Sequence, residues 1–109
     1  MGKSYLGEFE EIVLLTVAIL HGEAYGIAII DEMETRLKRA VSIGALQTVL
    51  RRLEDKGYLK SEFGEATKVR GGKRKRYFTV TNMGKKTLKA AKEQRVGLWN
   101  AIPEIALND

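Results

Sequence analysis

The chain has 109 residues, of which 44% are hydrophobic and none is cysteine. This length supports one domain with a real core, and the lack of cysteine excludes a disulfide framework and thiolate chemistry. The most apolar run, residues 12–20, is too short to span a bilayer, follows acidic residues and lacks the cleavage site of a signal peptide. We therefore expect a cytoplasmic protein without a membrane segment.

The charged residues are segregated along the sequence. Residues 1–37 contain two basic and seven acidic residues, whereas residues 38–95 contain seventeen basic and five acidic residues, and the net charge is +5. Concentrated positive charge gains affinity for a polyanion by releasing condensed counterions. The basic block is therefore a candidate nucleic-acid footprint, with a merely solubilising basic surface as the alternative.

Two helices are expected in the N-terminal third. The first, at about residues 8–20, has an acidic first turn that complements the helix dipole. After that turn it is apolar on almost every side, so we expect a second chain to cover part of it. Gly22 follows as a helix stop. The second helix, at about residues 25–37, has a stripe expected to be buried that consists of Gly26, Ile29, Ile30, Met33 and Leu37.

A third helix is expected between an N-cap at Ser42 and a stop at Gly57. Its periodicity predicts that Ile43, Leu46, Val49, Leu50 and Leu53 are buried. The outward residues are of the kinds that read base edges or bind phosphate. For Arg51 the alternative is an ion pair with Asp55, one turn further along. The candidate contacts are Ser42, Gly44, Gln47, Thr48, Arg51 and Arg52.

Two alternating segments predict a hairpin after this helix. Leu59 and Phe63 fall on one face of the first strand, and Phe78 and Val80 on one face of the second. The loop between them, residues 64–74, is basic around a Gly-Gly pair, so it is expected to approach a phosphate backbone closely. A solvated charge run is the alternative. The candidate contacts in and beside this loop are Lys68, Arg70, Lys73, Arg74 and Arg76.

A fourth helix is expected from about Asn82, capped by Thr81 and ended by Pro103. Few elements remain to cover its apolar side chains, which predicts an interface with a second copy of the chain. Trp99 has a second interpretation, as one wall of an effector pocket. One placement for the short tail is against the first helix. The candidate interface residues are Phe9, Leu88, Leu98, Trp99 and Ile102.

The sequence does not predict catalysis, a metal site or a cofactor. It contains no catalytic triad, acid pair or metal-ligand cluster, and no complete phosphate-binding loop. The single histidine, His21, stands at a helix end, where a cation near the last carbonyls is a sufficient explanation. We therefore expect a binding protein and not an enzyme.

Three segments resemble PadR-type bacterial transcriptional regulators: LGEFEEIVLLTVAILHGEAYGIAII, LRRLEDKGYLKSE and RYFTVTNMGKKTL, within about residues 6–95. The resemblance implies an α+β, mainly α fold. Residues 1–81 would form a winged helix-turn-helix domain of three helices and a two-stranded wing, with residues 42–56 as recognition helix. Residues 82–109 would add a C-terminal dimerisation helix and tail to the same compact unit.

The family further implies a homodimer that represses promoters from operator DNA, often relieved by a small effector, here expected to be hydrophobic. This chain carries Gln47 and Thr48 where such recognition helices usually have a Tyr-Pro pair, so the operator sequence does not transfer. Only one helix follows the wing, as in the short subtype. The rival interpretations are a winged helix that binds RNA and a protein-interaction module whose wing docks on an acidic partner.

Overall fold

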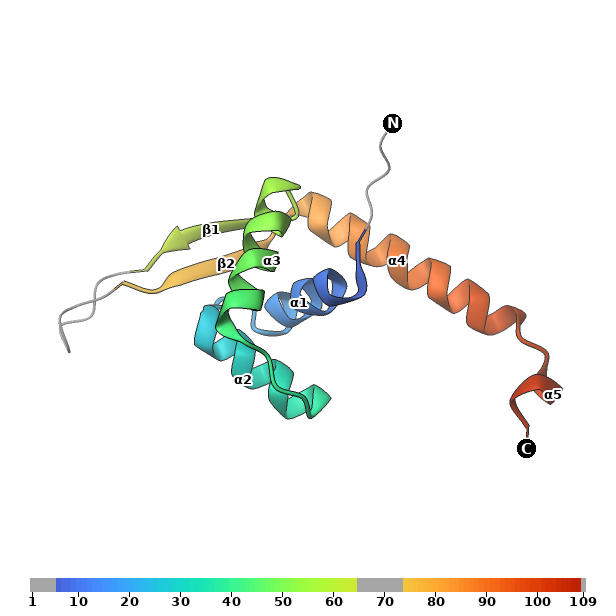
Figure 1. Cartoon of the computed structure of the whole chain (residues 1–109). Coiled ribbons are helices and arrows are strands. Elements are labelled where there is room, and N and C mark those ends of the chain that lie inside the picture. Colours follow the sequence, from blue (N-terminus) through green and yellow to red (C-terminus); the bar gives the residue numbers. More distant parts are fainter. Residues whose placement is uncertain (1–5, 65–73, 109) are drawn as a thin grey trace.

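The computed structural model describes residues 6–64 and 74–108 (Figure 1). Within them the chain is mainly helical with one two-stranded antiparallel sheet, in the order expected of a winged helix-turn-helix. Lys68, Arg70 and Lys73 of the expected wing tip lie outside the described residues. The elements are α1 (Glu8–Ile19), α2 (Gly26–Leu37), α3 (Ile43–Asp55), β1 (Leu59–Phe63), β2 (Arg76–Val80), α4 (Asn82–Ala101) and α5 (Glu104–Leu107).

The core forms where α1 packs against α2, α3 and β2 (Figure 1). Removing these apolar side chains from water is the main stabilising contribution to the fold, about 1.5–3 kcal/mol for each large side chain that is fully buried. The prediction that Leu37 and Ile43 are buried is wrong. They are 41% and 45% exposed, because each stands at an end of its helix. The fully buried large side chains are Val13, Leu14, Val17, Ile29, Met33, Leu46, Leu53 and Tyr58.

Side-chain caps fix the starts of α3 and α4, as expected. Ser42 Oγ accepts a hydrogen bond of 3.1 Å from the Ala45 amide, and Thr81 Oγ1 accepts one of 3.0 Å from the Gly84 amide. The Thr81 hydroxyl also donates to the carbonyl of Gly57, at 2.6 Å. Gly57 ends α3 with a φ of +85°, which glycine adopts without steric cost. These bonds hold the end of α3, the base of the wing and the start of α4 together.

The wing is attached to the body through β2. Leu59 pairs with Val80 and Phe63 with Arg76 at the two ends of the sheet. The Phe78 amide donates to the carbonyl of Ala24, at 2.8 Å, and so joins β2 to the turn between α1 and α2. Phe63 is exposed because the strands extend beyond the core at that end.

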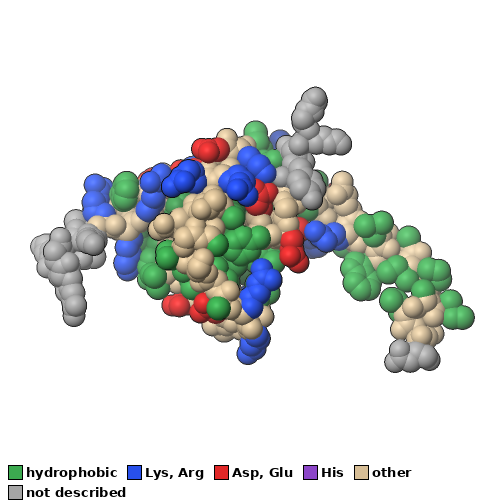
Figure 2. Space-filling model, viewed as in Figure 1, with side chains coloured by type: hydrophobic (Ala, Val, Ile, Leu, Met, Phe, Trp, Pro, Cys, Tyr) green, Lys and Arg blue, Asp and Glu red, His purple; other side chains and the backbone are tan. Residues whose placement is uncertain are grey.

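Helix α4 begins on the body and then leaves it (Figure 1). Gly84 is buried against Tyr58, whereas residues from Lys92 to Ala101 are exposed. The placement of the tail against α1 is not the one found: Pro103 separates α4 from α5, and Ile105 in α5 is 79% exposed. Apolar side chains are thus gathered at the projecting end of the molecule (Figure 2).

Candidate nucleic-acid interface

A hollow of about 840 Å³ lies between α3, the start of α2 and the loop-side end of β2. Lys and Arg side chains gather over the wing strands and the end of α3 that adjoins them (Figure 2). The hollow therefore has a helix on one side and a basic strand on the other. Its lining includes Gln47 and Arg51 from α3, Tyr25, Gly26 and Ile27 from the start of α2, and Arg74, Lys75 and Arg76 from the wing.

The predicted outward face of α3 is exposed. Gly44, Gln47, Thr48 and Arg51 are all accessible, and an added Cβ on Gly44 would have no neighbour within 4 Å. Among the described residues no ion pair joins Arg51 to Asp55, so the alternative use of this arginine is not realised. The Ser42 hydroxyl, by contrast, already serves as the helix cap.

Arg52 lies apart from the hollow and faces α1. Its guanidinium is 3.9 Å from the carboxylate of Glu10, which also accepts two hydrogen bonds of 3.0 Å from Lys56 Nζ. The same carboxylate accepts one of 2.9 Å from the Gly7 amide. Glu10, which the sequence suggested only as a partner of the helix dipole, is buried and connects α1 to the C-terminal end of α3.

The pKa of Glu10 is lowered by these contacts. Burial raises it, because desolvation disfavours the charged form, but the hydrogen bonds from Gly7 and Lys56 and the charges of Lys56 and Arg52 outweigh that effect. A carboxyl group whose pKa is lower in the folded than in the unfolded protein stabilises the fold. This stabilisation is fully present at pH values above the unfolded pKa and is lost as the pH falls through the folded pKa.

We expect Glu10→Gln to lower the free energy of unfolding at pH 7 by about 1.5–3 kcal/mol, because charge-assisted hydrogen bonds to Lys56 are lost. Urea unfolding should show this deficit shrinking as the pH falls below 4.5, the ordinary pKa of glutamate, and through the lowered pKa of Glu10, where the wild-type carboxylate also becomes neutral. The exposed Glu93→Gln is the matched control. A deficit that stays constant with pH would contradict this role of the charge.

The described wing cations differ in how they are held. Arg74 Nε donates to the carbonyl of Gly64, at 2.9 Å. Arg76 donates to Ser61 Oγ, at 2.8 Å, and stands 3.5 Å from the Glu54 carboxylate, so part of its charge is neutralised. Both guanidinium groups lie 5.4 Å from the centre of the Phe63 ring.

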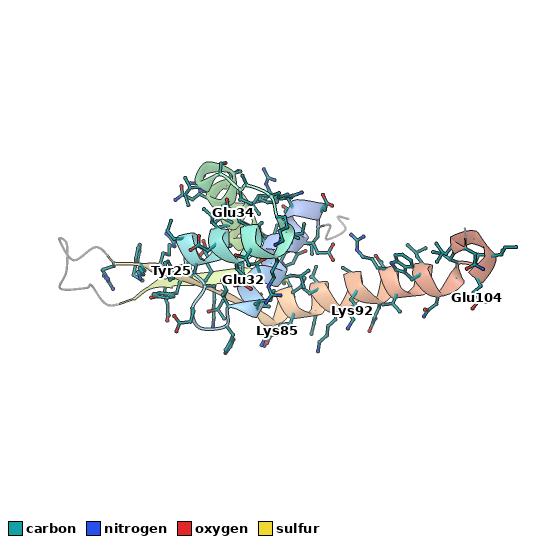
Figure 3. All side chains as sticks on the ribbon, turned by 90° about the horizontal axis from the view of Figure 1, so that it is seen from below. Tyr25, Glu32, Glu34, Lys85, Lys92 and Glu104 are labelled. Atoms are coloured by element: carbon teal, nitrogen blue, oxygen red, sulfur yellow. The ribbon has the colours of Figure 1, made fainter. Side chains whose placement is uncertain are left out.

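Tyr25 is a residue of the hollow that the sequence did not suggest as a contact, and it lies against Lys75, one of the basic residues beside the wing tip. Lys75 Nζ lies 4.3 Å from the centre of the Tyr25 ring, and that ring meets Tyr77 edge-on with centroids 5.6 Å apart. Figure 3 shows Tyr25 beside the wing strands. The sequence signal was weak, because the two partners are fifty residues apart and only the fold brings them together.

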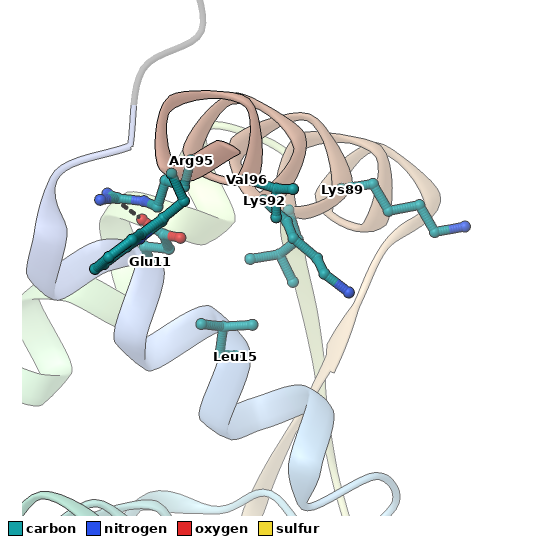
Figure 4. A pocket seen from close by; sticks show the side chains of 8 residues that line it. Glu11, Leu15, Lys89, Lys92, Arg95 and Val96 are labelled. Carbon is teal, nitrogen blue, oxygen red and sulfur yellow. Dashed lines mark hydrogen bonds and ion pairs between the residues drawn. The ribbon is translucent and has the colours of Figure 1, made fainter. Parts of the chain in front are cut away.

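A second hollow, of about 460 Å³, lies between α1 and α4 (Figure 4). Its walls are apolar, and Arg95 at its edge pairs with Glu11 at 2.9 Å. Of the expected interface residues, Leu88 and Trp99 line it, while Phe9 packs against the core beneath Arg39. Leu98 is exposed outside it, and Ile102 is half-buried beyond the end of α4. The lining is Glu11, Leu15, Leu88, Lys89, Lys92, Arg95, Val96 and Trp99.

Other kinds of site find no support in the part of the chain that is described. Residues 6–64 and 74–108 contain no group of three or more His, Cys, Asp or Glu side chains suited to a metal ion. The same ranges contain no helix whose length and hydropathy would let it cross a bilayer.

Comparison with known proteins relates this architecture to one family. The family model described as "Transcriptional regulator PadR-like family" matches residues 14–90. No curated protein matches the sequence significantly. Among solved structures, a PadR-like transcription factor from Bacteroides fragilis is 27% identical with a TM-score of 0.70, and the match covers 84% of each chain.

Two further solved structures agree with this assignment. A transcriptional regulator from Clostridium thermocellum is 29% identical with a TM-score of 0.65, over 78% of this chain and 79% of its own. A PadR family regulator from Clostridium difficile is 27% identical with a TM-score of 0.62, over 82% and 91%. The chain therefore belongs to the PadR-like family of transcriptional regulators, which are DNA-binding proteins and not enzymes.

Proposed function

We propose that this protein is a cytoplasmic repressor that binds operator DNA as a homodimer through α3 and the wing. The observation that carries the proposal is the hollow in which exposed polar side chains of α3 face basic side chains of the wing. A recognition helix enters a major groove and supplies specificity, while cations beside it bind phosphates and supply affinity. Both kinds of group are present on one surface here.

Each residue of this surface has a distinct proposed role. Gln47 is suited to bidentate hydrogen bonds with an adenine edge, and Arg51 to guanine or phosphate. Gly44 allows the backbone of α3 to approach the base edges closely, and Thr48 presents a hydroxyl group to them. Arg74 and Lys75 would bind the phosphate backbone. Arg52 takes a smaller part, because its charge is directed towards Glu10.

The test is a binding selection from random duplexes, followed by competition with RNA and with an acidic protein. We expect an inverted-repeat duplex to be selected and to compete best. Gln47→Ala should flatten the preference at one base pair of each half-site by about 1–3 kcal/mol while leaving nonspecific binding nearly intact. Gln94→Ala, an exposed glutamine on α4, is the matched control. Equal competition by RNA or by the acidic protein would contradict the proposal.

The proposed homodimer would form over α1 and α4. Leu15 and Ile19 of α1 are 45% and 50% exposed, and Leu98 and Trp99 of α4 are 70% and 64% exposed. Contiguous apolar surface of this kind marks an interface. A two-fold dimer would place two recognition helices about 34–36 Å apart, on successive major grooves. The apolar hollow beside Trp99 is the place where we propose that a small hydrophobic effector relieves repression.

We expect Trp99→Ala to weaken the dimer by at least about 2 kcal/mol, or roughly 30-fold in Kd, as for a large aromatic side chain at an interface. The folded monomer should be little affected, because Trp99 contacts few groups within its own chain. Analytical ultracentrifugation measures the association. Ile27→Ala, which removes a similarly exposed side chain from the other hollow, is the control. A wild-type monomer at low micromolar concentration would overturn the dimer.

A further inference from the structure

Two large aliphatic side chains are exposed at the hollow proposed for DNA. Ile43, at the start of α3, is 45% exposed, and Ile27, in the first turn of α2, is 57% exposed. Both line the hollow that contains Gln47. The surface proposed for dimerisation, with Leu15 and Ile19 of α1 and Leu98 and Trp99 of α4, does not include these two side chains.

Ile43 packs against the start of α2. An added Cβ on Gly26 would lie 3.6 Å from Ile43 Cδ1, so the isoleucine rests on the first residue of α2. Its branched Cβ further restricts the first side-chain torsion angle. The result is an apolar group with a restricted first torsion angle at the N-terminal end of α3, which is the end that contacts base edges in helix-turn-helix proteins.

Ile43 and Gln47 are four residues apart, so they lie on the same face of α3, about 5–6 Å apart at their Cβ atoms. Successive base pairs are about 3.4 Å apart along the duplex. The two side chains therefore reach neighbouring positions in one major groove. The apolar group that base pairs display in that groove is the C5-methyl of thymine.

We propose that Ile43 reads a thymine methyl group next to the base pair contacted by Gln47, with Ile27 extending the apolar surface beside it. Each operator half-site would then contain a thymine whose methyl group contributes to binding. The proposal rests on the proposed function, because it requires α3 to enter a major groove of DNA. It adds a specificity-determining residue that hydrogen-bonding patterns do not reveal.

The test replaces thymine by uracil, one position at a time, in the duplex obtained by selection. Uracil pairs as thymine does and lacks only the methyl group. For the wild-type protein we expect one position in each half-site to lose about three- to tenfold in affinity, the effect of removing one buried methyl group. Ile43→Ala should lose a similar factor on the thymine duplex and lose nothing more on the uracil duplex. Ile43→Val, which keeps the branched Cβ, should retain most of the discrimination.

Several outcomes would overturn the inference. It fails if the selected half-site contains no thymine, if uracil is tolerated at every position, or if uracil weakens wild type and Ile43→Ala by the same factor. The measurement on the wild-type protein alone needs no variant, so a folding defect could not hide the answer. If no duplex is preferred at all, the proposed function fails together with the inference. If a duplex is preferred but its methyl groups have no effect, only the inference fails.

Discussion

Replacing Gly84 by alanine is expected to lower the free energy of unfolding by about 3 kcal/mol, because the new methyl group has no room. Its carbon would lie 2.3 Å from the backbone oxygen of Tyr58 and 2.8 Å from Val80 Cγ1. The backbone oxygen already accepts a hydrogen bond from the Thr81 amide, at 3.0 Å. To make space, α4 would have to move away from the wing and break that contact.

Gly97 provides the matched control for this experiment. It also lies within α4, but an added Cβ there would have no neighbour within 4 Å. Gly97→Ala should therefore raise the free energy of unfolding by about 0.5–1 kcal/mol, the difference in helix propensity. The urea midpoints of the two variants should move in opposite directions from that of the wild type. Equal midpoints would show that α4 can shift away from Tyr58 at little cost.

DNA affinity is expected to fall by about 10³–10⁵ between 50 and 200 mM salt, if the dimer neutralises about six to ten phosphates. The described cations on the proposed surface include Arg51, Arg74 and Lys75, and the block of residues 38–95 has seventeen basic residues against five acidic ones. Because released counterions drive such binding, the slope of log affinity against log salt reports the number of phosphate contacts.

Lys75→Gln is the informative variant for this measurement. Lys75 packs over Tyr25 on the surface of the hollow, whereas Arg76 also holds Glu54 and Ser61 and its removal would disturb the fold. We expect Lys75→Gln to weaken binding to all sequences alike and to reduce the salt slope by about 1 for each half-site. Lys86→Gln, an exposed lysine of α4 outside both hollows, should leave the slope unchanged. If the two variants behave alike, the wing does not contact phosphate.

Local sequence signals predicted the elements of the fold well. Ser42, Gly57 and Thr81 determine where α3 and α4 begin or end, and each does so through its own cap or backbone angle. The residue with left-handed backbone that ends α2 is Lys38, with a φ of +58°. Because it is not a glycine, its residue type did not predict the end of this helix. Capping depends on nearby residues, which explains why it can be predicted without knowing the tertiary structure.

The candidate site was less predictable because it depends on contacts between distant segments. Helical periodicity correctly predicted that Gln47 and Arg51 are exposed, but it wrongly predicted that Ile43 is buried. The sequence period cannot show that the core ends before the first turn of α3. It also gave no sign that Glu10 would meet Lys56, forty-six residues away. For the same reason Arg52 looked equivalent to Arg51, although the two face different elements.

The contact between α4 and Tyr58 also determines how a movement of α4 would be transmitted to α3 in the proposed dimer. A helix of 20 residues is about 30 Å long. Pivoting it by about 10° at Gly84 would displace its far end by about 5 Å, by simple trigonometry on that length. Conversely, a small sliding movement between two paired α4 helices would reappear as a rotation of each recognition helix. In the proposed dimer, the spacing of the two α3 helices would therefore depend on the contacts of Gly84 and Thr81 and on the Glu11–Arg95 ion pair.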